Sequence, residues 1–203
     1  SSGVTSSGSS GAIVLGSGTA TGGKGGDVSL TVGAGNLAAG GDITLTSGES
    51  TTDTGGGIWV TTGLGSATSS GAVAIRTADA GTSGVSGLLS FSSGTTTKGT
   101  SGTVLIGTGD ALLGKGGDIA LYVGSGDLAA GGDITLSAGE STEDTGGGVW
   151  VTTGFGSATS SGAIAIRTSD AGTIGVSGVL SFSSGTTTSG SSGAVVVGSG
   201  TAT

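Results

Sequence analysis

The sequence has no cysteine, histidine, methionine or proline among its 203 residues. Without cysteine there are no disulfides and no thiolate metal ligands, and the lack of histidine also removes most zinc sites and nucleophile–base pairs. No stretch brings a nucleophile, a base and an electrostatic stabiliser together. We therefore predict that the chain is not an enzyme and that it binds no cofactor.

Positive charge is also scarce, since five lysine and arginine residues stand against 13 aspartate and glutamate residues, for a net charge of −8. Nucleic acids and anionic membrane surfaces both need clustered cations, which five scattered residues cannot provide. No apolar run approaches the roughly 18 residues that a membrane-spanning helix requires. We expect no nucleic-acid partner and no membrane insertion.

Glycine is plentiful, with 50 residues, and it recurs with a fixed period. The segment GGDITLTSGESTTDT at 40–54 is followed in the same register by GGGIWVTTGLGSATS at 55–69. The chain from Ser10 onward divides into such coils, and successive coils begin at intervals equal to the length of these two, except that the coils at Ser70 and Ser161 are one residue longer. The coils begin at Ser10, Gly25, Gly40, Gly55, Ser70, Ser86, Ser101, Gly116, Gly131, Gly146, Ser161, Ser177 and Ser192.

Six consecutive coils together form a longer repeat, which we call a superrepeat. Residues 10–100 align without a gap with residues 101–191, and 67 of the 91 positions are identical. Residues 1–9 match the end of a preceding coil, and residues 192–203 begin a third superrepeat. We expect a single continuous domain over 1–203 that is an internal part of a longer repeat protein, because no atypical capping coil is visible.

The fourth and sixth residues of each coil are aliphatic or phenylalanine, as in Ile43 and Leu45. Alternation with period two and many β-branched residues is typical of strands, whereas this much glycine disfavours helices. A 15-residue coil has no room for a crossover helix, so its strands would stack in parallel on those of the next coil. The predicted fold is therefore all-β, a β-solenoid in which Ile43 and Leu45 lie beneath Ile58 and Val60.

This alternation places the fifth and seventh residues of each coil on the outer face. Trp59 and Trp150 occupy the same fifth position in the two superrepeats, and Tyr122, Arg76 and Arg167 occupy seventh positions. An exposed aromatic beside an arginine suits an assembly contact or a glycan contact. The alternative is local packing, with each arginine paired to a nearby carboxylate.

We predict no metal site, and the positions that come nearest to a calcium site are Asp27, Asp42, Asp118 and Asp133, which would stack in pairs on adjacent coils. The alternative is that they are solvated residues balanced by Lys24 and Lys115 just upstream. Two threonine runs are candidates for O-glycosylation. These runs are Thr95, Thr96 and Thr97, and Thr186, Thr187 and Thr188.

With its GGD-[IV]-x-L, SGA-[IV]-x-I and SG-[LV]-L-S-F coils, the chain resembles the long Gly/Ser/Thr repeat proteins from which algae and other protists build extracellular filaments, such as mastigoneme shafts. The resemblance implies a structural protein, extracellular or on the cell surface, that associates with itself or with other filament proteins and carries glycans. No functional residue can be carried over to this chain from the resemblance. Two alternatives remain open, an ice-binding (antifreeze) solenoid with a threonine face and a repeat adhesin that binds a surface or a glycan.

Overall fold

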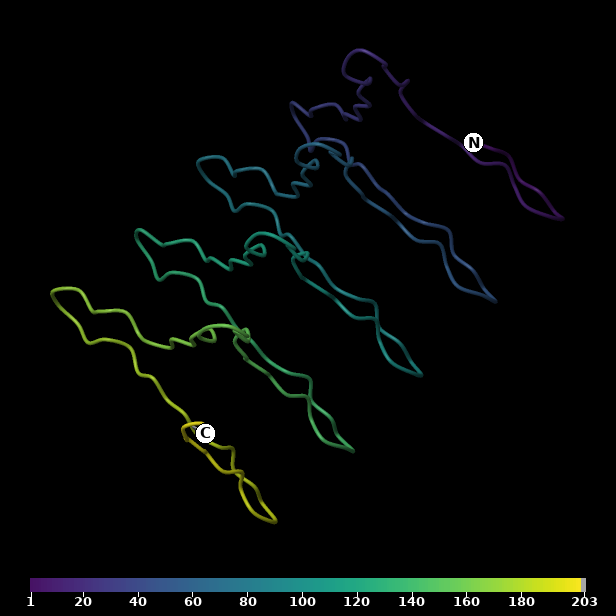
Figure 1. The fold of residues 1–203 in the computed structure, drawn as a ribbon. Coiled ribbons are helices and arrows are strands. Elements are labelled where there is room, and N and C mark those ends of the chain that lie inside the picture. The colour runs from purple at the N-terminus through teal and green to yellow at the C-terminus, as the bar shows by residue number, and fades with distance from the viewer. Residues whose placement is uncertain (202–203) are drawn as a thin grey trace. The chain divides into compact units, whose positions relative to one another are not determined.

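The computed structural model describes residues 1–201. These residues form no α-helix and no β-strand, and the ribbon in Figure 1 shows neither. The chain separates into two compact units, Ser1–Val104 and Leu105–Thr203. The division lies close to position 100/101, where the second superrepeat begins.

The prediction of a β-solenoid is wrong. Within residues 1–201 the backbone–backbone hydrogen bonds form no ladder between coils, so Ile43 and Leu45 are not strand neighbours of Ile58 and Val60. Every one of these bonds joins a glycine N–H to the carbonyl of a glycine eight residues earlier. Hydrogen bonding in the described residues is therefore local and does not connect strands in a sheet.

The reason for the missing sheet is a lack of apolar material to bury. Each coil carries two large aliphatic positions, and its second half offers mostly glycine, serine, threonine and alanine to cover them. Ordering the backbone costs about 1–2 kcal/mol per residue, and glycine is at the upper end of that range. No hydrophobic residue in the described part of the chain is buried. A single copy therefore lacks the burial that would hold its own coils together as paired strands.

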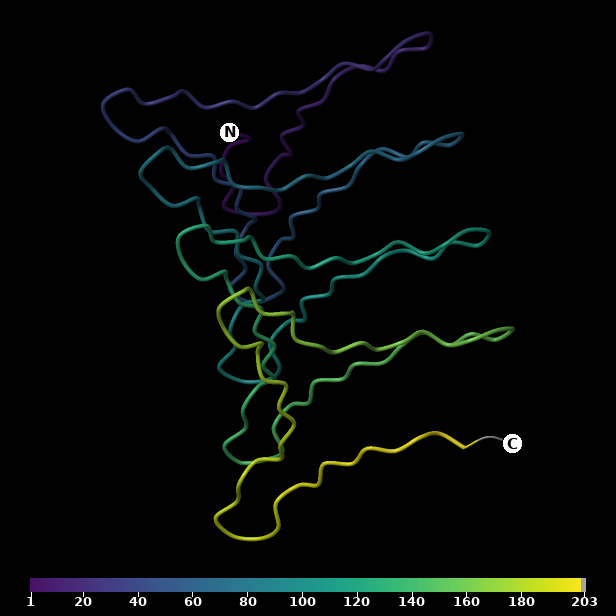
Figure 2. The ribbon, with the colours of Figure 1, turned by 90° about the vertical axis from the view of Figure 1, so that its left-hand side faces the viewer.

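The coil period itself is visible in the structure as thirteen bends of three residues within residues 1–201. Successive bends are separated by the length of one coil, so the interval grows by one residue across each of the two 16-residue coils. Figure 2 shows the ribbon running out and turning back repeatedly along the chain, in narrow excursions and in wider loops. The bends cover 6–8, 21–23, 36–38, 51–53, 66–68, 82–84, 97–99, 112–114, 127–129, 142–144, 157–159, 173–175 and 188–190.

Side chains alternate in exposure along the first half of several coils. Trp59 is 90% exposed, between Ile58 at 56% and Val60 at 73%. In the coil that begins at Ser86, Leu88 is 89% exposed and its neighbour Leu89 is 47% exposed. The fourth residue of a coil thus lies on the more sheltered side of an extended chain and the fifth on the open side, as expected for period-two geometry.

Within the described residues there is no helix of the length and hydropathy needed to cross a membrane.

Candidate functional site: coil junctions and the exposed residues around them

The most enclosed points of the chain are the contacts between consecutive coils. We call each of them a coil junction, defined as the eighth residue of one coil together with the second residue of the next. Ser47, Thr62, Thr77 and Thr153 are eighth residues, and they are among the few positions in residues 1–201 that are not fully exposed. The junction is therefore where one coil is attached to the next.

At several junctions the second residue of the coil has no room for a side chain. A Cβ atom on Gly26 would lie 3.0 Å from Ser17 Cβ, and a Cβ atom on Gly41 would lie 2.5 Å from Val32 Cγ1. The second superrepeat has the same crowding at Gly132, where the distance to Val123 Cγ1 would be 2.7 Å. The side chain of the eighth residue occupies the space that a second-position side chain would need.

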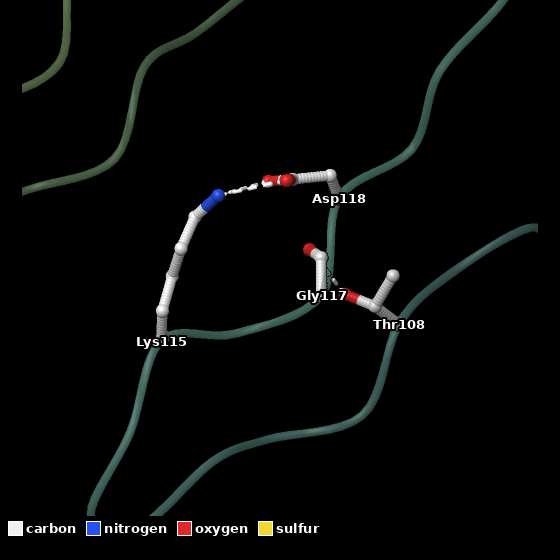
Figure 3. Close-up of polar contacts among 4 residues, drawn as sticks. All are labelled: Thr108, Lys115, Gly117 and Asp118. Carbon is white, nitrogen blue, oxygen red and sulfur yellow. Dashed lines mark hydrogen bonds and ion pairs between the residues drawn. The ribbon is translucent and has the colours of Figure 1, made fainter.

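Hydrogen bonds reinforce several junctions. The Gly56 N–H donates to the Gly48 carbonyl at 2.9 Å, and the Ser47 hydroxyl donates to the Gly56 carbonyl at 2.8 Å. Figure 3 shows a hydroxyl contact of the same kind at another junction, from Thr108 to the Gly117 carbonyl at 3.3 Å, which corresponds to the contact of Ser17 with Gly26 in the first superrepeat. The other glycine pairs, donor first, are Gly26–Gly18, Gly41–Gly33, Gly71–Gly63, Gly147–Gly139 and Gly162–Gly154.

Two junctions also carry an ion pair. Lys24 Nζ lies 2.7 Å from an Asp27 carboxylate oxygen, and Lys115 Nζ lies 2.7 Å from Asp118, as Figure 3 shows. All four side chains are largely exposed, so each pair makes a small, salt-sensitive contribution to stability. These are the ion pairs found within residues 1–201, and they do not include Asp42 or Asp133.

The carboxylates do not gather into a metal site in the described part of the chain. No group of three or more acidic, histidine or cysteine residues there is arranged to hold an ion. Asp53 and Asp144 instead cap their own bends, because each accepts a hydrogen bond from the next backbone N–H, at 2.8 Å and 2.7 Å. The geometry thus assigns local structural roles to acidic residues and offers no support for a calcium ion at Asp27, Asp42, Asp118 or Asp133.

The two tryptophans lie on the open side of their coils, each above a glycine. A Cβ atom on Gly57 would lie 3.1 Å from Trp59 Nε1, and the same distance separates Gly148 from Trp150 Nε1. These glycines are the third residues of GGG triplets, which occur only in the tryptophan coils. The missing side chain leaves room for the indole to lie along the backbone, and Trp150 is 91% exposed. We call each pair an indole shelf.

The arginines that we paired with these tryptophans line separate recesses. Arg76, Thr77, Ala78 and Asp79 line an open recess of about 370 Å³, and the equivalent residues 167–170 line another of about 350 Å³. Neither Trp59 nor Trp150 lines a recess, and neither arginine takes part in an ion pair found within residues 1–201. Tyr122 is exposed on the open side of its own coil.

The middle threonine of each candidate O-glycosylation run stabilises a turn. The Thr96 hydroxyl donates to the Lys98 carbonyl at 2.8 Å, and the Thr187 hydroxyl donates to the Ser189 carbonyl at 2.9 Å. Each turn ends on a glycine with positive φ, 97° at Gly99 and 107° at Gly190, a conformation that other residues rarely adopt. The flanking threonines are Thr95, Thr97, Thr186 and Thr188, and all four are exposed.

Sequence reasoning missed the coil junction. The available signal was that the second residue is glycine in all thirteen coils, while the eighth is always serine, threonine, valine or alanine. A glycine that never varies, paired with a small residue that is never glycine, indicates a close contact between the two positions.

In comparisons with known proteins, no family model, curated sequence or solved structure matches this chain.

Proposed function

We propose that the chain is a structural protein that associates with further copies of itself to form an extracellular or cell-surface fibre. The observation that carries this proposal is the exposure of its aliphatic residues. Large hydrophobic side chains recur at fixed positions in every coil, and none of those in the described residues is buried.

The amount of exposed surface supports association over a free monomer. The chain exposes 19820 Å². A compact protein of 18.3 kDa would expose only about 8,000 Å². The excess is several times the roughly 1,600 Å² that a standard protein–protein interface buries. The part of this surface that the exposed aliphatic side chains contribute is unfavourable in water unless it is covered.

A second copy is the partner that fits this surface best. The apolar positions recur once per coil over the whole chain, so a partner must display apolar groups with the same spacing. Another copy of the chain meets this condition along its full length. The resemblance to filament proteins of protists supports placing the assembly outside the cell.

The test is the concentration dependence of assembly, followed by sedimentation and electron microscopy. Replacing Leu45 and its equivalent Leu136 by serine removes two apolar side chains, each worth about 1.5–3 kcal/mol when buried. We expect the concentration at which fibres form to rise by about tenfold or more, since about 1.4 kcal/mol corresponds to a factor of ten.

The matched control replaces the adjacent open-side residues, Thr44→Ser with Thr135→Ser, and should leave that concentration nearly unchanged. A protein that stays monomeric at several hundred micromolar would contradict the proposal. Saturable binding of such a monomer to a defined glycan would instead favour an adhesin. Nothing in the geometry of residues 1–201 favours ice binding, because the flat face of paired strands that it was expected to use is not formed.

A further inference from the structure

Two kinds of feature repeat along this chain, and they have different periods. The coil junction and the bend recur once in every coil. Other features recur only once in every superrepeat. These are the Lys24–Asp27 and Lys115–Asp118 pairs, the indole shelves at Trp59 and Trp150, and the recesses at Arg76 and Arg167.

The short period alone would leave the alignment of two copies undetermined. A copy displaced by one coil presents glycine where glycine was and an aliphatic residue where an aliphatic residue was. Thr44 of one copy would then lie opposite Ser29 of the other, and both are fifth residues of their coils. Repeats of this kind are prone to slippage because register is only weakly specified.

The 16-residue coil removes this freedom. When one copy is displaced by one coil, the extra residue puts the two copies one position out of step over one coil in every six. Leu89 would face Ala74, and Phe91 would face Arg76. A shift of one residue turns side chains to the opposite side of an extended chain, so the apolar residues of that coil no longer meet.

The alternation in exposure shows that this mismatch matters in this coil. Leu89 is 47% exposed and lies on the sheltered side, whereas Leu88 is 89% exposed and lies on the open side. A displaced partner would thus offer its less apolar side to the sheltered residues. A displacement by one whole superrepeat restores every match, including the positions of the 16-residue coils and the indole shelves.

From these observations we propose that the face formed by the fourth and sixth residues of the coils binds a second copy in the same chain direction, aligned either without displacement or displaced by whole superrepeats. The 16-residue coils at 70–85 and 161–176 set this register. The inference rests on the proposed self-association, but it concerns how copies align and can fail while assembly stands.

The lack of cysteine in the natural sequence makes the register directly measurable. Single cysteines are introduced as Leu45→Cys, Leu30→Cys and Leu136→Cys, all at sixth positions on the face that is proposed to contact the second copy. Fibres assembled from equal mixtures of two variants are oxidised, and the disulfide-linked pairs are identified by mass spectrometry. Copies of one variant cross-link to each other when they are aligned without displacement.

The proposal predicts which mixed pairs form. Leu45→Cys with Leu136→Cys should give mixed dimers, because these positions are equivalent in the two superrepeats. Leu45→Cys with Leu30→Cys should give at least fivefold fewer mixed dimers than same-position dimers. Equal yields in the second mixture would overturn the register while leaving the fibre intact, and a dominant antiparallel pattern would overturn the chain direction.

A deletion variant tests whether the 16-residue coils set the register. Deleting Ala80 and Ala171 makes all coils equal in length and keeps the arginine and aspartate of each recess. In this background the mixed dimers of Leu45→Cys and Leu30→Cys should rise to match the same-position dimers. The control Ala80→Gly with Ala171→Gly keeps the length and should keep the unmixed pattern.

An unchanged ratio in the deletion variant would refute the role of the 16-residue coils. If the deletion variant did not assemble, the cysteine mixtures in the chain of unaltered coil length would still test the proposed register. If no protein in the series assembled at all, the proposed function would fail instead.

Discussion

The coil at 55–69 and the next one at 70–85 differ by one residue, and they end differently. The 15-residue coil closes on the following coil through the Gly71 N–H, which donates to the Gly63 carbonyl at 3.2 Å. No such bond follows either 16-residue coil among the backbone hydrogen bonds of residues 1–201, and none follows the 15-residue coils that begin at Ser86, Ser101 and Gly116. In the two 16-residue coils the ninth residue is Ala78 or Ser169 instead of glycine, and an open recess with an arginine and an aspartate lies at that place. The coil at 55–69 thus ends in a hydrogen-bonded, closed junction, and the coil at 70–85 ends in an open one beside a charged recess.

The largest effect that we expect from a test of this contrast comes from adding a side chain at the second-position glycine of a closed junction. Gly41→Ala puts a Cβ atom 2.5 Å from Val32 Cγ1, and a β-branched neighbour has few other rotamers to adopt. We expect a loss of about 1–3 kcal/mol in the stability of the assembled protein, measured by urea dissociation. At the end of a 16-residue coil, Gly178→Ala meets Thr168 Cγ2 only at 3.4 Å and should cost less than about 0.5 kcal/mol. Equal costs would mean that the two kinds of junction pack alike.

The repeat could be predicted from the sequence much more fully than the fold. The lengths of the coils reappear in the bends, and the pattern at 58–60 correctly puts Trp59 on the open side. Whether the coils pair into a sheet could not be predicted reliably from the sequence, because alternation reports only which side a residue faces. It does not report whether the backbone of the next coil lies within hydrogen-bonding distance.

The candidate site was also only partly predictable, because residue spacing does not determine how each coil bends. The spacing of Lys24 and Asp27 suggested their pairing, and the ion pair is present. The recess at Arg76 depends on how the longer coil bends, which residue spacing alone does not determine. The indole shelf could have been found, since the third glycine before Trp59 is a visible exception among third residues.

A smaller effect should follow from removing a junction hydroxyl. Ser47→Ala deletes the donor to the Gly56 carbonyl and weakens the closed junction by about 0.5–1.5 kcal/mol. The Gly56 amide should then exchange its hydrogen about two- to tenfold faster, as measured by NMR. Thr168→Ala, at a 16-residue coil, should leave the exchange of the Gly178 amide unchanged. Faster exchange at Gly178 would indicate a hydroxyl contact at the open junction too.

The smallest expected effect concerns charge. Lys24→Gln removes an exposed ion pair at a closed junction, so the exchange of the Gly26 amide should rise by less than about twofold at low salt. The change should disappear at about 1 M salt, where charges are screened within roughly 3 Å. Arg76→Gln should change the exchange of the Gly87 amide at neither salt concentration. A salt-dependent change there would show that the recess holds a bound carboxylate or another anion.

If the chain associates with itself as proposed, its uncovered aliphatic residues make its stability depend on mass action. In such an assembly each copy would gain its favourable burial from neighbours, so the melting temperature should climb as more protein is added and fall on dilution. Chain ends of the assembly would be its weakest places, because the outermost copy has a neighbour on one side alone. Fragmentation should therefore speed disassembly in proportion to the number of new ends that it creates.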